Sequence, residues 1–170
     1  MSAPLAKRLA DLGLLAIVLA LACVLTAALA IEFGYGEKPC PLCLLERIGM
    51  FGICAGLGLH LRGGGAGRGV GLGLVCAVFL LVVSVRQVLL DICPRPGHAY
   101  VGSAVLGLHM PVWAVLIALA VISGIAVLLA GFGADALRGD APAPAVARLA
   151  RWSTLYVAAL AAVNLVAVAL

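Results

Sequence analysis

Residues 9–31 read LADLGLLAIVLALACVLTAALAI, a run in which Asp11 is the one charged residue. About 20 helical residues span the roughly 30 Å hydrocarbon core of a bilayer, so this run is long enough to cross it. The composition agrees, because 65% of the 170 residues are hydrophobic and 11% are charged. A water-soluble protein of this length could not bury so much apolar surface. The sequence therefore predicts a membrane protein.

Four further apolar runs have a similar length. They lie near residues 44–61, 70–91, 110–131 and 150–170. Lipid admits only helices or closed barrels, and the runs show no alternating strand pattern. We therefore predict an all-α integral membrane protein. Residues 1–135 would form a bundle of four transmembrane helices, and residues 136–170 a cytoplasmic linker and a fifth, C-terminal transmembrane helix.

The first run also has features of a cleaved signal peptide. Lys7 and Arg8 precede it, and Ala28-Leu29-Ala30 resembles a cleavage site. The apolar part is nearly 20 residues long, however, which exceeds the usual signal-peptide core. We therefore expect a retained helix.

Lysine and arginine are unevenly distributed between the two ends of the predicted helices. If the N-terminus is cytoplasmic, seven lie inside: Lys7, Arg8, Arg62, Arg68, Arg138, Arg148 and Arg151. Two, Lys38 and Arg95, lie in outer loops, while Arg47 and Arg86 lie near the outer helix ends. This bias predicts a cytoplasmic N-terminus and an outward-facing C-terminus. The distribution of the charges matters here more than the net charge of +4, and we expect no nucleic-acid partner.

Cys40 and Cys43 form a C-x-x-C motif where the second apolar run begins, on the outer, oxidising side. Such a motif is either half of a metal site or a redox dithiol. A structural zinc site needs four ligands, yet the sequence has no second C-x-x-C, and His98 and His109 are eleven residues apart. We therefore expect no metal.

The surroundings of the motif favour redox chemistry. Cys43 falls in the first turn of the expected helix, where free N–H groups and the helix dipole stabilise a thiolate. Arg47 follows four residues later, on the same helix face. It is either an interfacial anchor or a fixed cation beside the sulfur and beside a ligand oxygen. Cysteines 23, 54 and 76 lie inside apolar runs and are interpreted as small buried hydrophobic residues.

Three segments together resemble a known family. Residues 40–47, CPLCLLER, resemble the signature of the disulfide bond formation protein B family. Residues 106–113, LGLHMPVW, are similar to the start of that family's fourth helix, and Val85-Arg86-Gln87 resembles the end of its third helix more loosely. The resemblance covers roughly residues 9–131.

The resemblance implies a quinone-dependent protein thiol-disulfide oxidoreductase of the bacterial inner (plasma) membrane. Such a protein passes electrons from a periplasmic, thioredoxin-like thiol oxidase (DsbA-like) to ubiquinone or menaquinone. By analogy, Cys40 exchanges with the partner and Cys43 meets the quinone, while Arg47 binds the quinone carbonyl. The cysteines would face the periplasm.

The chain departs from the family in its outer loop, where the family carries a second cysteine pair. Here the loop has Cys93, and no cysteine follows it in the sequence. Cys93 would be a third catalytic cysteine that resolves Cys40, a thiol for a partner protein, or a passive residue. We interpret His98, at the position of the missing cysteine, as a solvated loop histidine.

The incomplete cysteine set leaves other functions open. The dithiol could serve a membrane reductant or an electron-transfer component of a maturation pathway. The chain could also be a non-enzymatic assembly subunit with a structural or metal-binding role for its cysteines. The direction of electron flow depends on reduction potentials, which the sequence does not give.

Other residues predict helix packing. The pairs Gly52/Gly56 and Gly69/Gly73 are spaced as small-xxx-small motifs. Asn164, inside the fifth run, is expected to bond a neighbouring helix. Residues 99–108 form a mildly apolar stretch that we expect on the membrane surface.

Overall fold

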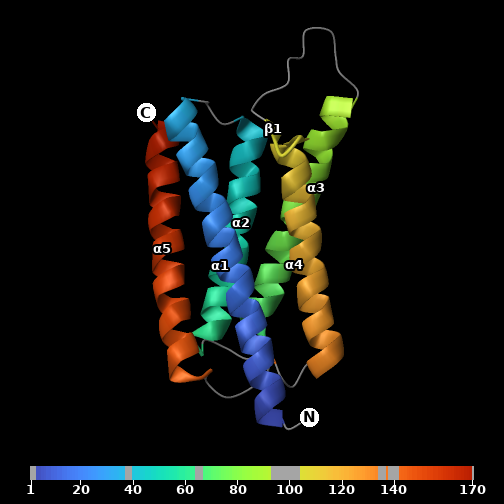
Figure 1. Cartoon of the computed structure of the whole chain (residues 1–170), viewed down its shortest axis with the longest axis vertical. Coiled ribbons are helices and arrows are strands. Elements are labelled where there is room, and N and C mark those ends of the chain that lie inside the picture. Colours follow the sequence, from blue (N-terminus) through green and yellow to red (C-terminus); the bar gives the residue numbers. More distant parts are fainter. Residues whose placement is uncertain are drawn as a thin grey trace.

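The structure is a computed structural model that describes residues 3–36, 40–63, 67–92, 104–133, 137 and 142–169. Five helices and one small hairpin make up these residues (Figure 1). Their bounds are α1 Ala3–Tyr35, α2 Pro41–Leu61, α3 Arg68–Ile92, β1 Ala104–Val105, β2 Leu108–His109, α4 Met110–Phe132 and α5 Pro144–Ala169. The predicted all-α fold with a fifth helix is confirmed.

Each of the five described helices is long and apolar enough to cross a membrane. The 21 residues of α2 extend about 30 Å at 1.5 Å per residue, the thickness of a hydrocarbon core. The helices run up and down the bundle in turn, so the two chain ends lie at opposite ends of it (Figure 1). The protein is an integral membrane protein.

The bundle groups the ends of its helices as the charge pattern predicted. The start of α1, the end of α2 and the starts of α3 and α5 lie at one end of the bundle. That end carries six of the seven basic residues expected inside: Lys7, Arg8, Arg62, Arg68, Arg148 and Arg151. The seventh, Arg138, lies outside the described residues. The start of α2, with Cys40, lies at the opposite end (Figure 1).

Helix α2 begins three residues earlier than the apolar run suggested. Cys40 adopts an extended backbone and is the N-cap, and Pro41 occupies the first turn. Proline suits that position because the first turn needs no N–H donor there and the ring already fixes the helical φ. Helix α5 likewise starts at Pro144, six residues before the predicted run.

Small residues let α2 and α3 approach closely, as predicted. A Cβ atom on Gly56 would lie 2.6 Å from the backbone nitrogen of Gly73 and 2.7 Å from the carbonyl oxygen of Gly69. One on Gly52 would reach the sulfur of Cys76. Lipid tails are as apolar as leucine, so close packing of this kind is a main driving force for association of helices in a bilayer.

Helix α5 packs along α1 and α2 at the edge of the bundle (Figure 1). It buries Ala150, Val157 and Asn164 there. The hydroxyls of Thr26 on α1 and Tyr156 on α5 share a hydrogen bond of 2.8 Å. The fifth helix is thus held to the other helices by polar as well as apolar contacts.

A two-residue turn in front of α4 was not predicted. Strands β1 and β2 pair in antiparallel register, Ala104 with His109 and Val105 with Leu108. The turn residues Leu106 and Gly107 both have positive φ, 52° and 78°. That combination characterises the tight hairpin turns whose twist matches the flanking strands. Residues 104–108, the described part of the stretch 99–108, form this hairpin and are exposed, and their position on the membrane surface stays a prediction.

The isolated cysteines differ in burial. Cys54 is fully buried and Cys76 half-buried, as expected for small apolar residues. Cys23 is exposed on the outer surface of α1, so the interpretation of it as buried is wrong. Its helix turns this position away from the core that Ala22 and Leu25 enter.

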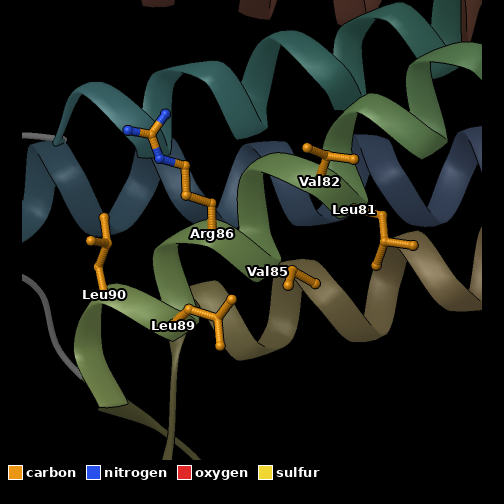
Figure 2. Close-up of a pocket in the computed structure, with 6 residues that line it drawn as sticks. All are labelled: Leu81, Val82, Val85, Arg86, Leu89 and Leu90. Carbon is orange, nitrogen blue, oxygen red and sulfur yellow. The ribbon is translucent and has the colours of Figure 1, made fainter. Parts of the chain in front are cut away.

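An apolar groove runs along α3 near the Cys40 end of the bundle. It has a volume of about 460 Å³ and is lined by Leu81, Val82, Val85, Arg86, Leu89 and Leu90 (Figure 2). Arg86 is the one charged residue of this lining.

Candidate functional site

Cys40 and Cys43 form a disulfide at the start of α2, with their Cα atoms 5.1 Å apart. The sulfur of Cys40 also accepts a hydrogen bond of 3.1 Å from the backbone N–H of Cys43. A serine or aspartate oxygen usually caps a helix in this way, by satisfying a free N–H of the first turn. The predicted C-x-x-C pair therefore lies at the positive end of the helix dipole.

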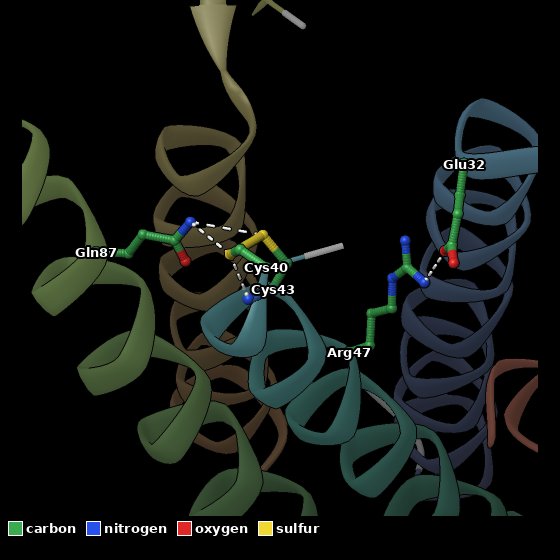
Figure 3. Close-up of a disulfide and its surroundings, with 5 residues drawn as sticks. All are labelled: Glu32, Cys40, Cys43, Arg47 and Gln87. Atoms are coloured by element: carbon green, nitrogen blue, oxygen red, sulfur yellow. Dashed lines mark hydrogen bonds and ion pairs between the residues drawn. A yellow bond between two sulfur atoms is a disulfide. The ribbon is translucent and has the colours of Figure 1, made fainter. Parts of the chain in front are cut away.

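A glutamine from α3 contacts the same two sulfurs. The side-chain nitrogen of Gln87 donates toward Sγ of Cys40 at 3.3 Å and toward Sγ of Cys43 at 3.5 Å (Figure 3). Gln87 is 7% exposed, and its carbonyl oxygen is buried with no hydrogen-bond partner among the described residues. The amide thus places one donor at the redox pair and keeps one acceptor free.

Arg47 turns away from the disulfide. Its Nη1 forms an ion pair with Glu32 of α1 and donates 2.7 Å to Oδ1 of Asn164 on α5. Its Nη2 lies 3.5 Å from the carbonyl oxygen of Ala28. Gln87 and Arg47 lie on opposite sides of the start of α2 (Figure 3). The i, i+4 spacing places Arg47 one helical turn after Cys43. Its long side chain, however, extends toward the carboxylate of Glu32 on α1.

The partners of Arg47 explain how a buried guanidinium is accommodated. Arg47 is 9% exposed, and an unpaired charge in that position would be strongly unfavourable. The carboxylate of Glu32 neutralises it, and Asn164 and Ala28 accept further N–H groups. The expectation that Asn164 bonds a neighbouring helix is confirmed.

No role was predicted from the sequence for four polar residues near the site: Glu32, Gln87, Glu46 and Ser84. Glu46 is 5% exposed, and its Oε1 has no hydrogen-bond partner among the described residues. Its side chain lies beside Ser84 of α3. One signal was available, because polar residues inside membrane spans are rare and usually functional. That signal could not indicate which polar residues on different helices contact each other.

Two predicted site residues, Cys93 and His98, lie outside the described residues. The structure therefore relates Cys40, Cys43 and Arg47 to each other but gives no position for the loop thiol. Within the described ranges, no group of three His, Cys, Asp or Glu side chains comes together that could hold a metal ion.

The family model described as disulfide bond formation protein DsbB matches residues 10–99, which is more than half of the chain. The chain belongs to this family. The match covers most of α1 and all of α2 and α3, hence the disulfide, Arg47 and Gln87. Searches of curated proteins and of solved structures give no match.

Membership of the DsbB family identifies the chain as a membrane disulfide oxidoreductase. The Cys40–Cys43 disulfide lies within the matched region. Helix α5 lies beyond the family match and yet supplies Asn164 to Arg47. The site of this DsbB-family member thus includes a residue from outside the matched region.

Proposed function

We propose that the protein oxidises a thioredoxin-like partner in the periplasm and delivers the electrons to a membrane quinone, ubiquinone or menaquinone. The observation that carries the proposal is the Cys40–Cys43 disulfide at the mouth of α2 in a DsbB-family chain. Its sulfurs are half-buried at the end of the bundle, so a partner thiolate has access to them.

Cys40 is proposed as the sulfur that meets the partner, and Cys43 as the sulfur that meets the quinone. Cys40 precedes α2 as its N-cap, whereas Cys43 lies inside the first turn, closer to the bilayer. A thiolate on Cys43 is stabilised there by the helix N-terminus. When bound, a quinone would accept two electrons and two protons.

The side chains near the disulfide fit such a lipid-soluble acceptor. The groove along α3 is apolar except for Arg86 and lies on the helix that also carries Gln87. Arg47, on the opposite side of the start of α2 from Gln87, is proposed to bind a quinone carbonyl, and the α3 groove is the alternative position for the ring. Arginine has five N–H donors, and the contacts described here use three of them.

The deciding experiment is quinone reduction by purified protein, with a reduced thioredoxin-like thiol oxidase as electron donor and a soluble ubiquinone analogue as acceptor. We expect Cys43→Ser to abolish quinone reduction and Cys54→Ala, a buried control, to leave it unchanged. Arg47→Ala should raise the KM for quinone. An increase with Arg86→Ala and none with Arg47→Ala would assign the carbonyl contact to the α3 groove instead.

The role of Cys93 is tested by trapping. The chain has no second loop cysteine, so a loop disulfide cannot form within it. We propose that Cys40 exchanges directly with the partner, with Cys93 at most forming a transient bond to Cys40. In Cys43→Ser protein, the partner should be trapped on Cys40. Capture on Cys93 would show that electrons enter through the loop.

The lack of a second loop cysteine also favours a second candidate function. This candidate is a membrane reductant that uses the same dithiol in the opposite direction. The same assay separates the two. Reduction of an oxidised partner by quinol, together with no oxidation of a reduced partner by quinone, would establish the reductant.

A further inference from the structure

Two hydrogen-bond donors converge on the sulfur of Cys40. One is the backbone N–H of Cys43 at 3.1 Å, and the other is the side-chain amide of Gln87 at 3.3 Å. The sulfur of Cys43 is reached by Gln87 alone among these contacts, at 3.5 Å. The two sulfurs of the pair are therefore not equivalent.

Donors directed at a sulfur favour its anionic form. A neutral disulfide sulfur is a weak acceptor, whereas a thiolate accepts strong, charge-assisted hydrogen bonds. The contact thus gains strength when the disulfide opens. It gains further because Gln87 is buried, where little water competes for the amide.

We propose that Gln87 stabilises Cys40 as the leaving thiolate when the oxidised partner is released. The inference rests on the proposed function, because it concerns release of the partner from that same site.

The exchange proceeds in two balanced steps. A partner thiolate attacks Sγ of Cys40 and forms a mixed disulfide, the Cys40–Cys43 bond breaks, and its electron pair goes to Cys43. Cys43 is thereby a thiolate, and the partner's second thiol gives its proton to water. The second partner thiolate then attacks the partner's own sulfur, the partner's disulfide forms, and the bond to Cys40 breaks with its electron pair left on Cys40. A better-stabilised thiolate leaves faster, so Gln87 acts on this second step.

The test isolates Cys40 in a Cys43→Ser background and needs neither partner nor quinone. The rate of alkylation of Cys40 by iodoacetamide is followed against pH, with the modified site located by mass spectrometry. Replacing Gln87 by methionine, which has nearly the same shape and no N–H, should move the half-maximal rate to a pH higher by about one unit. Ser84→Ala, a buried control one turn away on α3, should leave it unchanged.

Two results would overturn the inference. One is an unchanged midpoint in Gln87→Met protein, or in Gln87→Leu protein if the methionine variant does not fold. The other is a Cys40 alkylation midpoint in Cys43→Ser protein that equals the midpoint of free glutathione. This result needs no Gln87 variant. A protein that titrates as expected but does not reduce quinone would lose the proposed function and keep this role of Gln87.

Discussion

Asn164 of α5 accepts a hydrogen bond of 2.7 Å from the guanidinium of Arg47 on α2. The two residues are 117 positions apart in the chain. The bond links the last helix to the turn that follows the Cys40–Cys43 disulfide. Because Arg47 is also paired with Glu32 of α1, three helices meet at one guanidinium.

Replacing Asn164 by leucine should weaken the attachment of α5. Arg47 would lose one acceptor but keep Glu32, so we expect a loss of about 1 kcal/mol in the free energy of unfolding, typical of hydrogen bonds between membrane helices. Thermal unfolding in detergent measures it. Val163→Ala, on the exposed side of α5, is the control. Equal stability of the Asn164→Leu and wild-type proteins would show that α5 is held by apolar packing alone.

A methyl group on Gly56 should disrupt the contact between α2 and α3. Its Cβ would lie 2.6 Å from backbone nitrogen, which has no room to move, so Gly56→Ala should destabilise the protein by about 1–3 kcal/mol. Gly71→Ala is the matched control, since a Cβ there meets nothing within 4 Å and alanine favours helix. If both alanines had the same effect, close backbone approach would not be what holds these helices together.

Removal of the indole N–H of Trp113 should loosen the hairpin before α4. The indole donates 3.0 Å to the carbonyl oxygen of Val105, in β1. In Trp113→Phe protein the ring stays and this bond is lost. Hydrogen exchange should therefore become faster at residues 104–109, with little change in α4. Unaltered exchange in the hairpin would mean that the strand pairing suffices.

The orientation in the membrane is tested by labelling. After mild reduction of intact cells, a membrane-impermeant maleimide should modify Cys40 in a Cys93→Ala background. A cysteine introduced at Arg68, at the other end of the bundle, in protein lacking cysteines 40, 43 and 93, should react only after permeabilisation. The reverse pattern would place the disulfide in the cytoplasm and remove the basis for a periplasmic partner.

The sequence was sufficient to predict the helices and to single out the Cys40–Cys43 pair, because both patterns are local. Each span follows from the length of its apolar run, and Cys40 and Cys43 from a three-residue spacing next to such a run. The close α2–α3 contact was also predictable, since Gly52 and Gly56 recur at one helical turn.

The environment of the site was not predictable in the same way. Glu32 is 15 residues from Arg47, Asn164 is 117 residues away, and Gln87 is 47 residues from Cys40. These pairings depend on how the helices pack, which no local pattern gives. The direction of the Arg47 side chain followed from its partners and not from its position in the helix.

The separation of Asn164 from Arg47 also imposes an order on synthesis. A ribosome adds about 5–20 residues per second, so Asn164 is made on the order of ten seconds after Arg47. Glu32 precedes Arg47 in the chain and is present from the start. If α1 and α2 enter the membrane during that interval, Glu32 can already neutralise Arg47, whereas Asn164 has not yet been made. Glu32 is therefore the first of the two side-chain partners available to Arg47, before α5 has been synthesised.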